Sequence, residues 1–179
     1  MKNLHLVVRS VTESTACKEL NSKFECPGNN VIVGRKHTGD ENGETVYKYG
    51  ALEFENTEDA EKYVIVFLDS GWSKQIKESA AEKFQCLNGH VIVGREHIGD
   101  ENGMTRYKTS RVVIVKKLDV EAVSDIPKEI KSKESDGTWV QCTGNDGTYK
   151  VMTGRQHTGD ENGATVTSFA NLVMNIKEE

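Results

Sequence analysis

The sequence predicts an all-β protein that contains three copies of one unit of about 60 residues. A Gly-Arg pair recurs at residues 34–35, 94–95 and 154–155, and each pair opens the same polar segment, G-R-x-H-x-G-D-E-N-G-x-T. The intervening segments are rich in β-branched residues and punctuated by glycine, which is typical of strands and turns. A unit this small cannot bury its own apolar face. We therefore expect one domain with pseudo-threefold symmetry, made of repeats 1–60, 61–115 and 116–179.

Each repeat offers about four strands, which gives about 12 strands in the chain. The first strand of each repeat is a short apolar run, and the second ends at Cys26, Cys86 or Cys142. The fourth begins after the motif turn, at Glu44, Met104 or Ala164. The expected first strands are Leu4–Val8, Val64–Leu68 and Leu118–Val123, and the expected third strands are Val31–Gly39, Val91–Gly99 and Val151–Gly159. The charged stretch Lys128–Glu134 is expected to be a solvated loop.

The motif predicts a hairpin. Asp40-Glu41-Asn42-Gly43 suits a type I turn followed by a glycine in the left-handed region. A three-residue loop of this kind places Gly39 opposite Thr45 and His37 opposite Tyr47. Because side chains alternate between the faces of a strand, Arg35, His37, Thr45 and Tyr47 share one face. Lys36, Thr38, Glu44 and Val46 share the other.

The three copies agree on the first face of the hairpin and differ on the second. Arg, His and Thr are identical there, and only Thr167 departs, replacing Tyr47 and Tyr107. Arginine, histidine, carboxylates and amides together suit a hydroxyl-rich ligand, and tyrosine adds an apolar surface for a sugar ring. The candidate ligand-binding residues are Arg35, His37, Asp40, Glu41, Asn42, Thr45, Tyr47, Arg95, His97, Asp100, Glu101, Asn102, Thr105, Tyr107, Arg155, His157, Asp160, Glu161, Asn162 and Thr165.

Other interpretations of the motif remain open. The turn residues can simply close the hairpin, while the arginines and histidines meet between the repeats and pair with the acidic residues. The acidic turn oxygens can bind Ca²⁺, or three related histidines can converge on one transition metal. Catalysis fits poorly, because an enzyme gathers unlike groups in one asymmetric pocket whereas here the same groups occur three times.

Three β-rich copies with one polar site each resemble the threefold lectins of the β-trefoil and β-prism types. Asp40-x-Asn42 and Thr45-x-Tyr47 approach the bulb-lectin pattern Q-x-D-x-N-x-V-x-Y. The spacing from Asn42 to Thr45 is one residue too long, the leading Gln is absent, and no Q-x-W signature occurs. The resemblance implies a β-trefoil first, a β-prism second, and multivalent sugar binding.

Composition narrows the function further. The formal net charge is −5, which gives no electrostatic footprint for nucleic acid. No apolar run is long enough for membrane insertion, and the N-terminal apolar part is too short for a signal peptide. We therefore expect a cytoplasmic protein, or one released without a cleaved signal peptide, that needs no cofactor.

The prediction is a non-enzymatic, multivalent lectin with glycans or glycoconjugates as partners, including acidic or surface glycans. The alternative is a non-catalytic structural or protein-interaction scaffold, in which the repeated motif stabilises the repeat interfaces. Solvent exposure of Arg35 and His37 distinguishes the two. Buried and mutually paired side chains indicate a scaffold, whereas open side chains indicate a binding site.

Overall fold

The computed structural model describes residues 2–40, 42–100, 102–115, 119–124, 128–133, 135, 137–160 and 162–176. Strand accounts for 65% of the residues and helix for 4%, so the all-β prediction is confirmed. No helix in the described ranges is long and apolar enough to cross a membrane. The elements are β1 (Lys2–Glu13), β2 (Cys17–Lys18), β3 (Lys23–Glu25), β4 (Asn30–Thr38), β5 (Glu44–Phe54), α1 (Thr57–Lys62), β6 (Val64–Trp72), β7 (Ala80–Gln85), β8 (His90–Ile98), β9 (Met104–Val115), β10 (Asp119–Ser124), β11 (Lys128–Lys133), β12 (Val140–Gln141), β13 (Val151–Thr158), β14 (Ala164–Ala170) and β15 (Leu172–Ile176).

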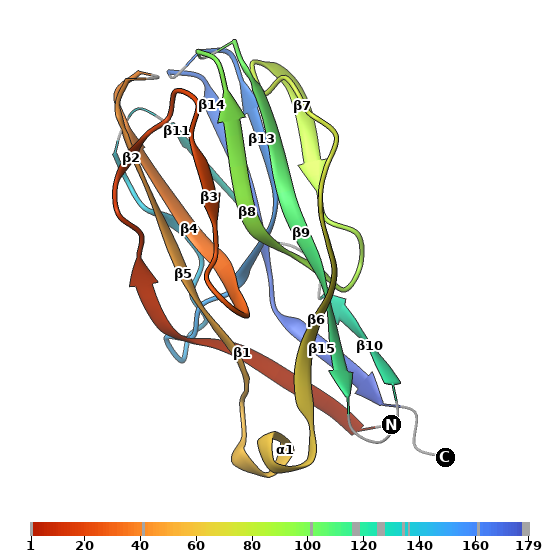
Figure 1. The fold of residues 1–179 in the computed structure, drawn as a ribbon. Helices are drawn as coiled ribbons and strands as arrows, with labels where there is room; N and C mark the ends of the chain where they lie inside the picture. The colour runs from red at the N-terminus through yellow and green to blue at the C-terminus, as the bar shows by residue number, and fades with distance from the viewer. Residues whose placement is uncertain are drawn as a thin grey trace.

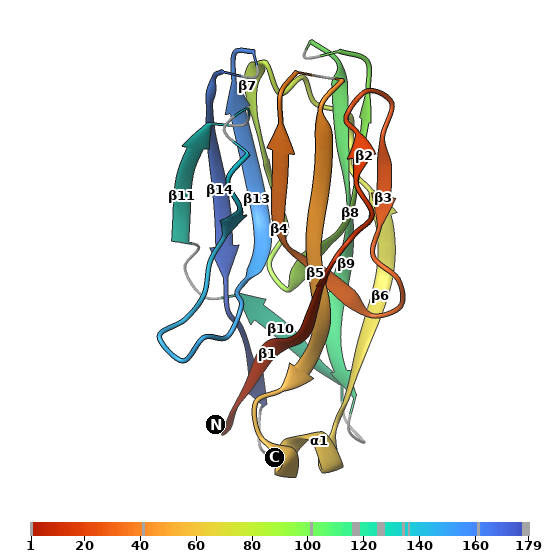
Figure 2. The same ribbon diagram turned by 90° about the vertical axis from the view of Figure 1, so that its left-hand side faces the viewer.

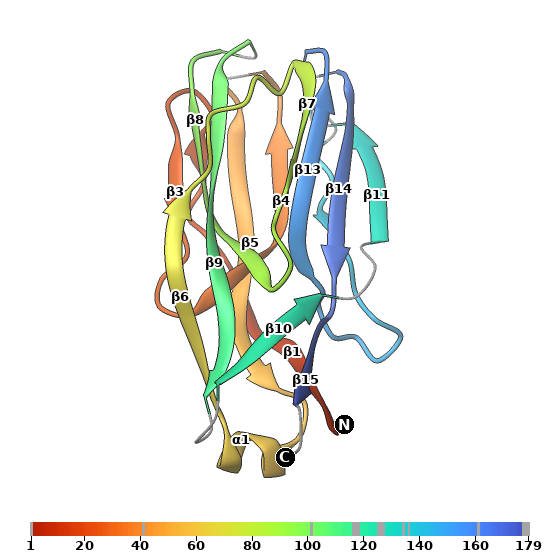
Figure 3. The same cartoon turned by 90° about the vertical axis from the view of Figure 1, so that its right-hand side faces the viewer.

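Three long hairpins, β4–β5, β8–β9 and β13–β14, lie side by side along the molecule (Figure 1). Their turns gather at one end, while α1 and the ends of β1 and β15 lie at the other (Figures 2 and 3). The strands form two curled sheets. The larger sheet has the order β12-β4-β5-β1-β15-β10-β9-β8-β3, with β2 on β5 and β6 on β9, and the smaller has the order β11-β14-β13-β7.

The three hairpins share one register. His37 lies opposite Thr45, His97 opposite Thr105 and His157 opposite Thr165. The predicted pairing of His37 with Tyr47 is therefore wrong, because Gly39 leaves the strand at a φ of +89° and the loop spans residues 39–43. The left-handed glycine is the one before the turn, not Gly43 after it. The predicted sharing of faces holds, since a shift of two residues keeps each side chain on its face.

A short segment of each repeat crosses onto the hairpin of the next. In β3, Phe24 of the first repeat pairs with Arg95 of the second. In β7, Phe84 of the second repeat pairs with Arg155 of the third, and in β12 Val140 of the third pairs with Arg35 of the first. The glycine before each arginine permits this crossing. A Cβ atom on Gly94 would lie 2.8 Å from the Phe24 carbonyl oxygen, and one on Gly154 would lie 2.8 Å from that of Phe84.

The apolar interior forms two clusters that draw on equivalent positions of each hairpin. One contains Val31, Val91 and Val151, and the other contains Ile32, Ile92 and Met152. A bulge at the residue before each Gly-Arg pair lets three consecutive residues of β4, Val31 to Val33, be buried together.

The third repeat departs most from the prediction. Lys128–Lys133 forms the strand β11, which pairs with β14, so the expectation of a solvated loop there is wrong. Apolar Ile130 lies opposite Thr167 and packs into the second cluster, which explains why a charged stretch is held as a strand. Leu118, the expected start of a first strand, lies outside the described residues, and β10 begins at Asp119. The names β-trefoil and β-prism remain predictions.

Candidate functional site

The arginine and histidine side chains of the motif lie inside the protein. Relative exposure is 7% for Arg35, 1% for Arg95 and 2% for Arg155, and it is 4% for each motif histidine. They face inward because the buried face of each hairpin carries alternate residues of both strands. Burying three guanidinium groups requires carboxylate partners close by.

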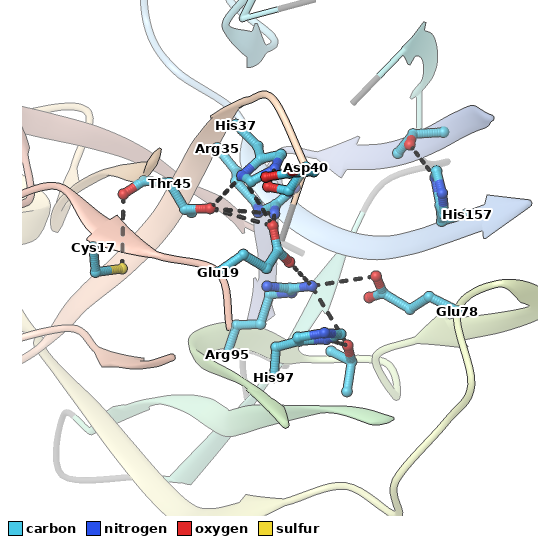
Figure 4. A network of polar contacts seen from close by, with 12 residues as sticks. Cys17, Glu19, Arg35, His37, Asp40, Thr45, Glu78, Arg95, His97 and His157 are labelled. Atoms are coloured by element: carbon cyan, nitrogen blue, oxygen red, sulfur yellow. Dashed lines mark hydrogen bonds and ion pairs between the residues drawn. The ribbon is translucent and has the colours of Figure 1, made fainter. Parts of the chain in front are cut away.

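The partners are two glutamates that precede the hairpins in sequence. Glu19 follows β2, whose Cys17 pairs with Thr45, and Glu78 follows Ile76, which pairs with Thr105. Both carboxylates are buried, at 6% relative exposure each. Together with the three motif arginines they form what we call the Arg–Glu cluster, which consists of Glu19, Arg35, Glu78, Arg95 and Arg155. Figure 4 labels Glu19, Arg35, Glu78 and Arg95 of this cluster.

The Arg–Glu cluster joins residues of different repeats. Arg95 Nη2 of the second repeat lies 2.6 Å from Glu19 Oε1 of the first and 3.2 Å from Glu78 Oε2 of its own. Arg155 Nη1 of the third repeat donates to Glu78 Oε2 of the second. Arg35 Nη2 donates to Glu19 Oε2 within the first repeat. The ion pairs therefore connect the first repeat to the second and the second to the third.

Charge pairing sets the protonation of the cluster. Burial by itself raises the pKa of Glu19, but Arg35, Arg95 and His37 together hold that pKa well below its usual range. Burial lowers the pKa of Arg95, yet Glu19 and Glu78 raise it well above the ordinary value. Glu19 and Arg95 are therefore both charged at neutral pH.

Each motif histidine bridges the motif turn and the hairpin threonine. His37 Nε2 donates to the Asp40 carbonyl oxygen at 2.9 Å, and its Nδ1 lies 2.8 Å from Thr45 Oγ1. The corresponding distances are 2.9 and 2.8 Å for His97, and 2.7 and 2.7 Å for His157. With Nε2 donating, a neutral His97 ring accepts from the Thr105 hydroxyl at Nδ1, whereas His37 Nδ1 also lies 3.0 Å from Glu19 Oε2. Burial and then Arg95 lower the pKa of His97, which favours this neutral ring.

The turn residues have a structural explanation of their own. Asp40 Oδ1 accepts from the Asn42 backbone N–H at 2.9 Å, and Gly43 N–H donates to the Asp40 carbonyl oxygen at 2.8 Å. The other two turns repeat both bonds. Asp40, Asp100, Asp160, Asn42, Asn102 and Asn162 are exposed at the turn ends. Glu41, Glu101 and Glu161 lie outside the described residues.

The tyrosines of the motif are buried in aromatic stacks rather than presented to solvent. Tyr47 and Tyr107 are each 1% exposed. Phe24 stacks on Tyr47 and Phe84 on Tyr107, both with ring centroids 4.5 Å apart. Both members of the stack change together in the third repeat, where Val140 and Thr167 take these places. A cavity of about 20 Å³ lies beside them, large enough for about one water molecule.

Metal binding by these residues is not supported by their contacts. Both ring nitrogens of each motif histidine already have protein partners. Across the described part of the chain, no group of three or more His, Cys, Asp or Glu side chains is placed to hold a metal ion. The cysteines there are free thiols, and burial raises the pKa of Cys26 and of Cys86 to about 12, so both stay protonated.

The sequence pattern identifies the cluster's arginines but not its glutamates or the stacked phenylalanines. A Lys-Glu pair precedes each motif, at 18–19, 77–78 and 133–134, but the signal is weak because Lys-Glu also occurs at 128–129 and 177–178. Its distance to the following Gly-Arg pair differs among the repeats, which hides it from a search at fixed spacing. Glu134, the third member, lies outside the described residues.

The structure brings Arg35, Arg95 and Arg155 together, and it holds Thr45, Thr105 and Thr165 against the histidines. It does not place them in three open pockets, because all of these side chains are buried. Carbohydrate binding remains a prediction. It was based on exposed arginine, histidine and tyrosine side chains, which the structure buries. No protein-family model, curated protein or solved structure matches this chain.

Proposed function

We propose that this protein is a non-catalytic structural or protein-interaction scaffold, in which the repeated polar motif holds the three repeats together. The observation that carries the proposal is the pairing of Arg95 with Glu19 across a repeat boundary, at 1% and 6% relative exposure. Charged groups buried to this extent and paired with one another cannot reach a sugar ligand without partial unfolding.

We further infer that the three repeats are related by a pseudo-threefold axis. Three observations support this organisation: the shared hairpin register, the bulge at one position and the crossing segments that run from each repeat to the next. The inner strands β4, β8 and β13 also contact one another pairwise. A β-trefoil, and after it a β-prism, stays the architecture expected from sequence.

Chemical denaturation of an Arg95→Met variant tests the scaffold function. Removal of Arg95 leaves the Glu19 carboxylate buried and short of a partner, so we expect the free energy of unfolding to fall by about 3–5 kcal/mol. Arg106→Met is the matched control, because Arg106 lies on the same hairpin and pairs with Glu96 on the solvent side. Loss of that partly exposed pair should cost less than about 1 kcal/mol.

A glycan array with the same two variants tests the competing lectin function. A scaffold predicts no glycan signal that depends on Arg95. If Arg95→Met is as stable as the wild type but loses a glycan that Arg106→Met still binds, the scaffold proposal is wrong.

A further inference from the structure

One junction of the larger sheet is left open. The strand β1 pairs with β5 of its own repeat and, at its other edge, with β15 of the third repeat. The strand β10 likewise pairs with β15 of its own repeat and with β9 of the second. The strand β6 pairs with β9, but among the described residues no strand occupies its second edge. At the two closed junctions, the first strand of one repeat pairs with the last strand of the repeat before it. The matching partner of β6 would be the end of β5, and the two strands do not pair.

The connection between β5 and β6 explains why they do not meet. The strand β9 ends at Val115 and β10 begins at Asp119, which is close enough for the two to pair as a hairpin. In contrast, β5 ends at Phe54 and β6 begins at Val64, and the intervening residues include α1. Asn56 caps α1 by accepting from the Asp59 N–H at 2.9 Å, so the separation is built by ordered structure.

A cavity of about 530 Å³ fills the opening between the two strands. We call this opening the seam. Leu52 and Phe54 line it from β5, Val64 and Ile65 from β6, and Tyr63 from the connection. Figure 1 shows α1 below the ends of β5 and β6. Val64 is 63% exposed, and Leu68 farther along β6 is 42% exposed, so β6 carries apolar side chains that the described part of the chain leaves exposed.

We propose that the seam binds an extended apolar segment of a partner polypeptide, which pairs as a β-strand with β6 and with the end of β5. The fold itself indicates this kind of occupant. The equivalent edge of β1 takes an antiparallel apolar strand, β15, with Leu4 opposite Met174 and Leu6 opposite Leu172. A strand added to an exposed edge gains backbone hydrogen bonds, and the apolar pockets beside the edge select its side chains.

Two features narrow the occupant to a flexible segment of low charge. An inserted strand has neighbours on both sides, so both of its edges must be free, which a strand inside a second folded copy of this chain cannot offer. The charged residues that line the seam are Arg9, Glu53 and Glu55. The charged atoms of Arg9 and Glu53 lie 3.8 Å apart, so the seam has only a small net negative charge and does not call for a strongly charged occupant. The proposal rests on the scaffold function, because it names the class of partner that the scaffold would hold.

Peptide binding to the full chain tests the proposal. The probe is a fluorescent, end-blocked peptide with the sequence of residues 171–176, Asn-Leu-Val-Met-Asn-Ile, and the control peptide carries proline at the position of Met174. Fluorescence anisotropy should show saturable binding of the first peptide and at least tenfold weaker binding of the second, since proline cannot donate to a strand ladder. Val64→Lys should weaken binding at least tenfold. Leu87→Lys, which changes an equally apolar residue that is 75% exposed and outside the seam, should alter it less than twofold.

Hydrogen–deuterium exchange locates the bound peptide. Binding in the seam should slow exchange of backbone amides in both Leu52–Glu55 and Val64–Phe67. Exchange that changes only at β1 and β15 means that the peptide has displaced β15, and this overturns the proposal. So does equal binding of the proline peptide, or a dimer in sedimentation that loses its concentration dependence in Val64→Lys and binds no peptide. If peptide binding fails while Arg95→Met is still destabilised, the seam proposal alone is wrong.

Discussion

A single guanidinium nitrogen of Arg95 lies 2.6 Å from Glu19 Oε1 and 3.2 Å from Glu78 Oε2, so one atom contacts carboxylates from two repeats. The arginine is 1% exposed, and each of the two glutamates is 6% exposed. This relationship places the polar motif at the boundary between repeats.

The Glu19–Arg95 ion pair should show a measurable coupling energy. A double-mutant cycle with Glu19→Gln and Arg95→Met should give on the order of 1–3 kcal/mol, because contacting residues in one buried network are not additive. The matched cycle with Glu96→Gln and Arg106→Met should give less than about 1 kcal/mol, since that pair lies on the solvent side of the same hairpin. Equal coupling in the two cycles would show that the buried pair has no special role.

Stability should fall on acidification in two stages. The folded-state pKa of His97 is lowered, so the unfolded chain takes up protons more readily as the pH falls below the ordinary value of 6.5. The folded-state pKa of Glu19 is also lowered, so a second loss begins as the pH falls below the ordinary value of 4.5. At pH 8 both His97 and Glu19 make their full contribution to the free energy of unfolding. Urea unfolding between pH 8 and pH 2 measures both contributions.

His97→Gln provides the control for the first stage. Its amide nitrogen can still donate to the Asp100 carbonyl oxygen, but the residue does not titrate. The variant should therefore lose less stability than the wild type between pH 7 and pH 5. A wild-type protein that becomes more stable as the pH falls through this window would contradict the assigned neutral ring.

The aromatic stack should contribute more to the free energy of unfolding than Val140 and Thr167, which take its place in the third repeat. Phe24→Ala removes a ring stacked on Tyr47 and should lower the free energy of unfolding by about 2–4 kcal/mol. Val140→Ala, at the equivalent crossing position, removes fewer buried atoms and should cost about 1 kcal/mol. Thermal or chemical unfolding of both variants gives the comparison, and a larger loss for Val140→Ala would be inconsistent with the packing described.

Gly43 should be the least replaceable glycine of the first hairpin turn. A Cβ atom there would lie 1.8 Å from the Thr38 carbonyl oxygen, so Gly43→Ala must displace the turn backbone. We expect a loss of about 2 kcal/mol or more, within the range for overpacking. Gly71→Ala serves as the control, since its nearest neighbour would lie 3.9 Å away, and it should change stability by less than about 1 kcal/mol. Differential scanning calorimetry reports both.

Some features of the fold and site could be read directly from local patterns. The alternation of residues around His37 and Thr45 predicted that they share a face, and the structure confirms this. The role of Asp40 in bonding the turn backbone was also predictable, because an Asx bond spans only two residues. The hairpin register was predicted wrongly, since Gly39 and Gly43 are both able to take a positive φ and sequence alone did not show which one does.

Local sequence patterns are enough to establish that the chain is all-β and that Arg, His and Thr recur together on one hairpin face. Whether that face meets solvent or the other repeats depends on the packing of the three hairpins. The deciding residues, Glu19 and Glu78, belong to segments that the sequence pattern leaves at irregular spacing before each motif. A polar face has the same local signature in both settings, because alternation along a strand reports which residues point together but not what they point toward. Carboxylates brought in from separate segments make burial of the three arginines possible, and that pairing exists only in three dimensions.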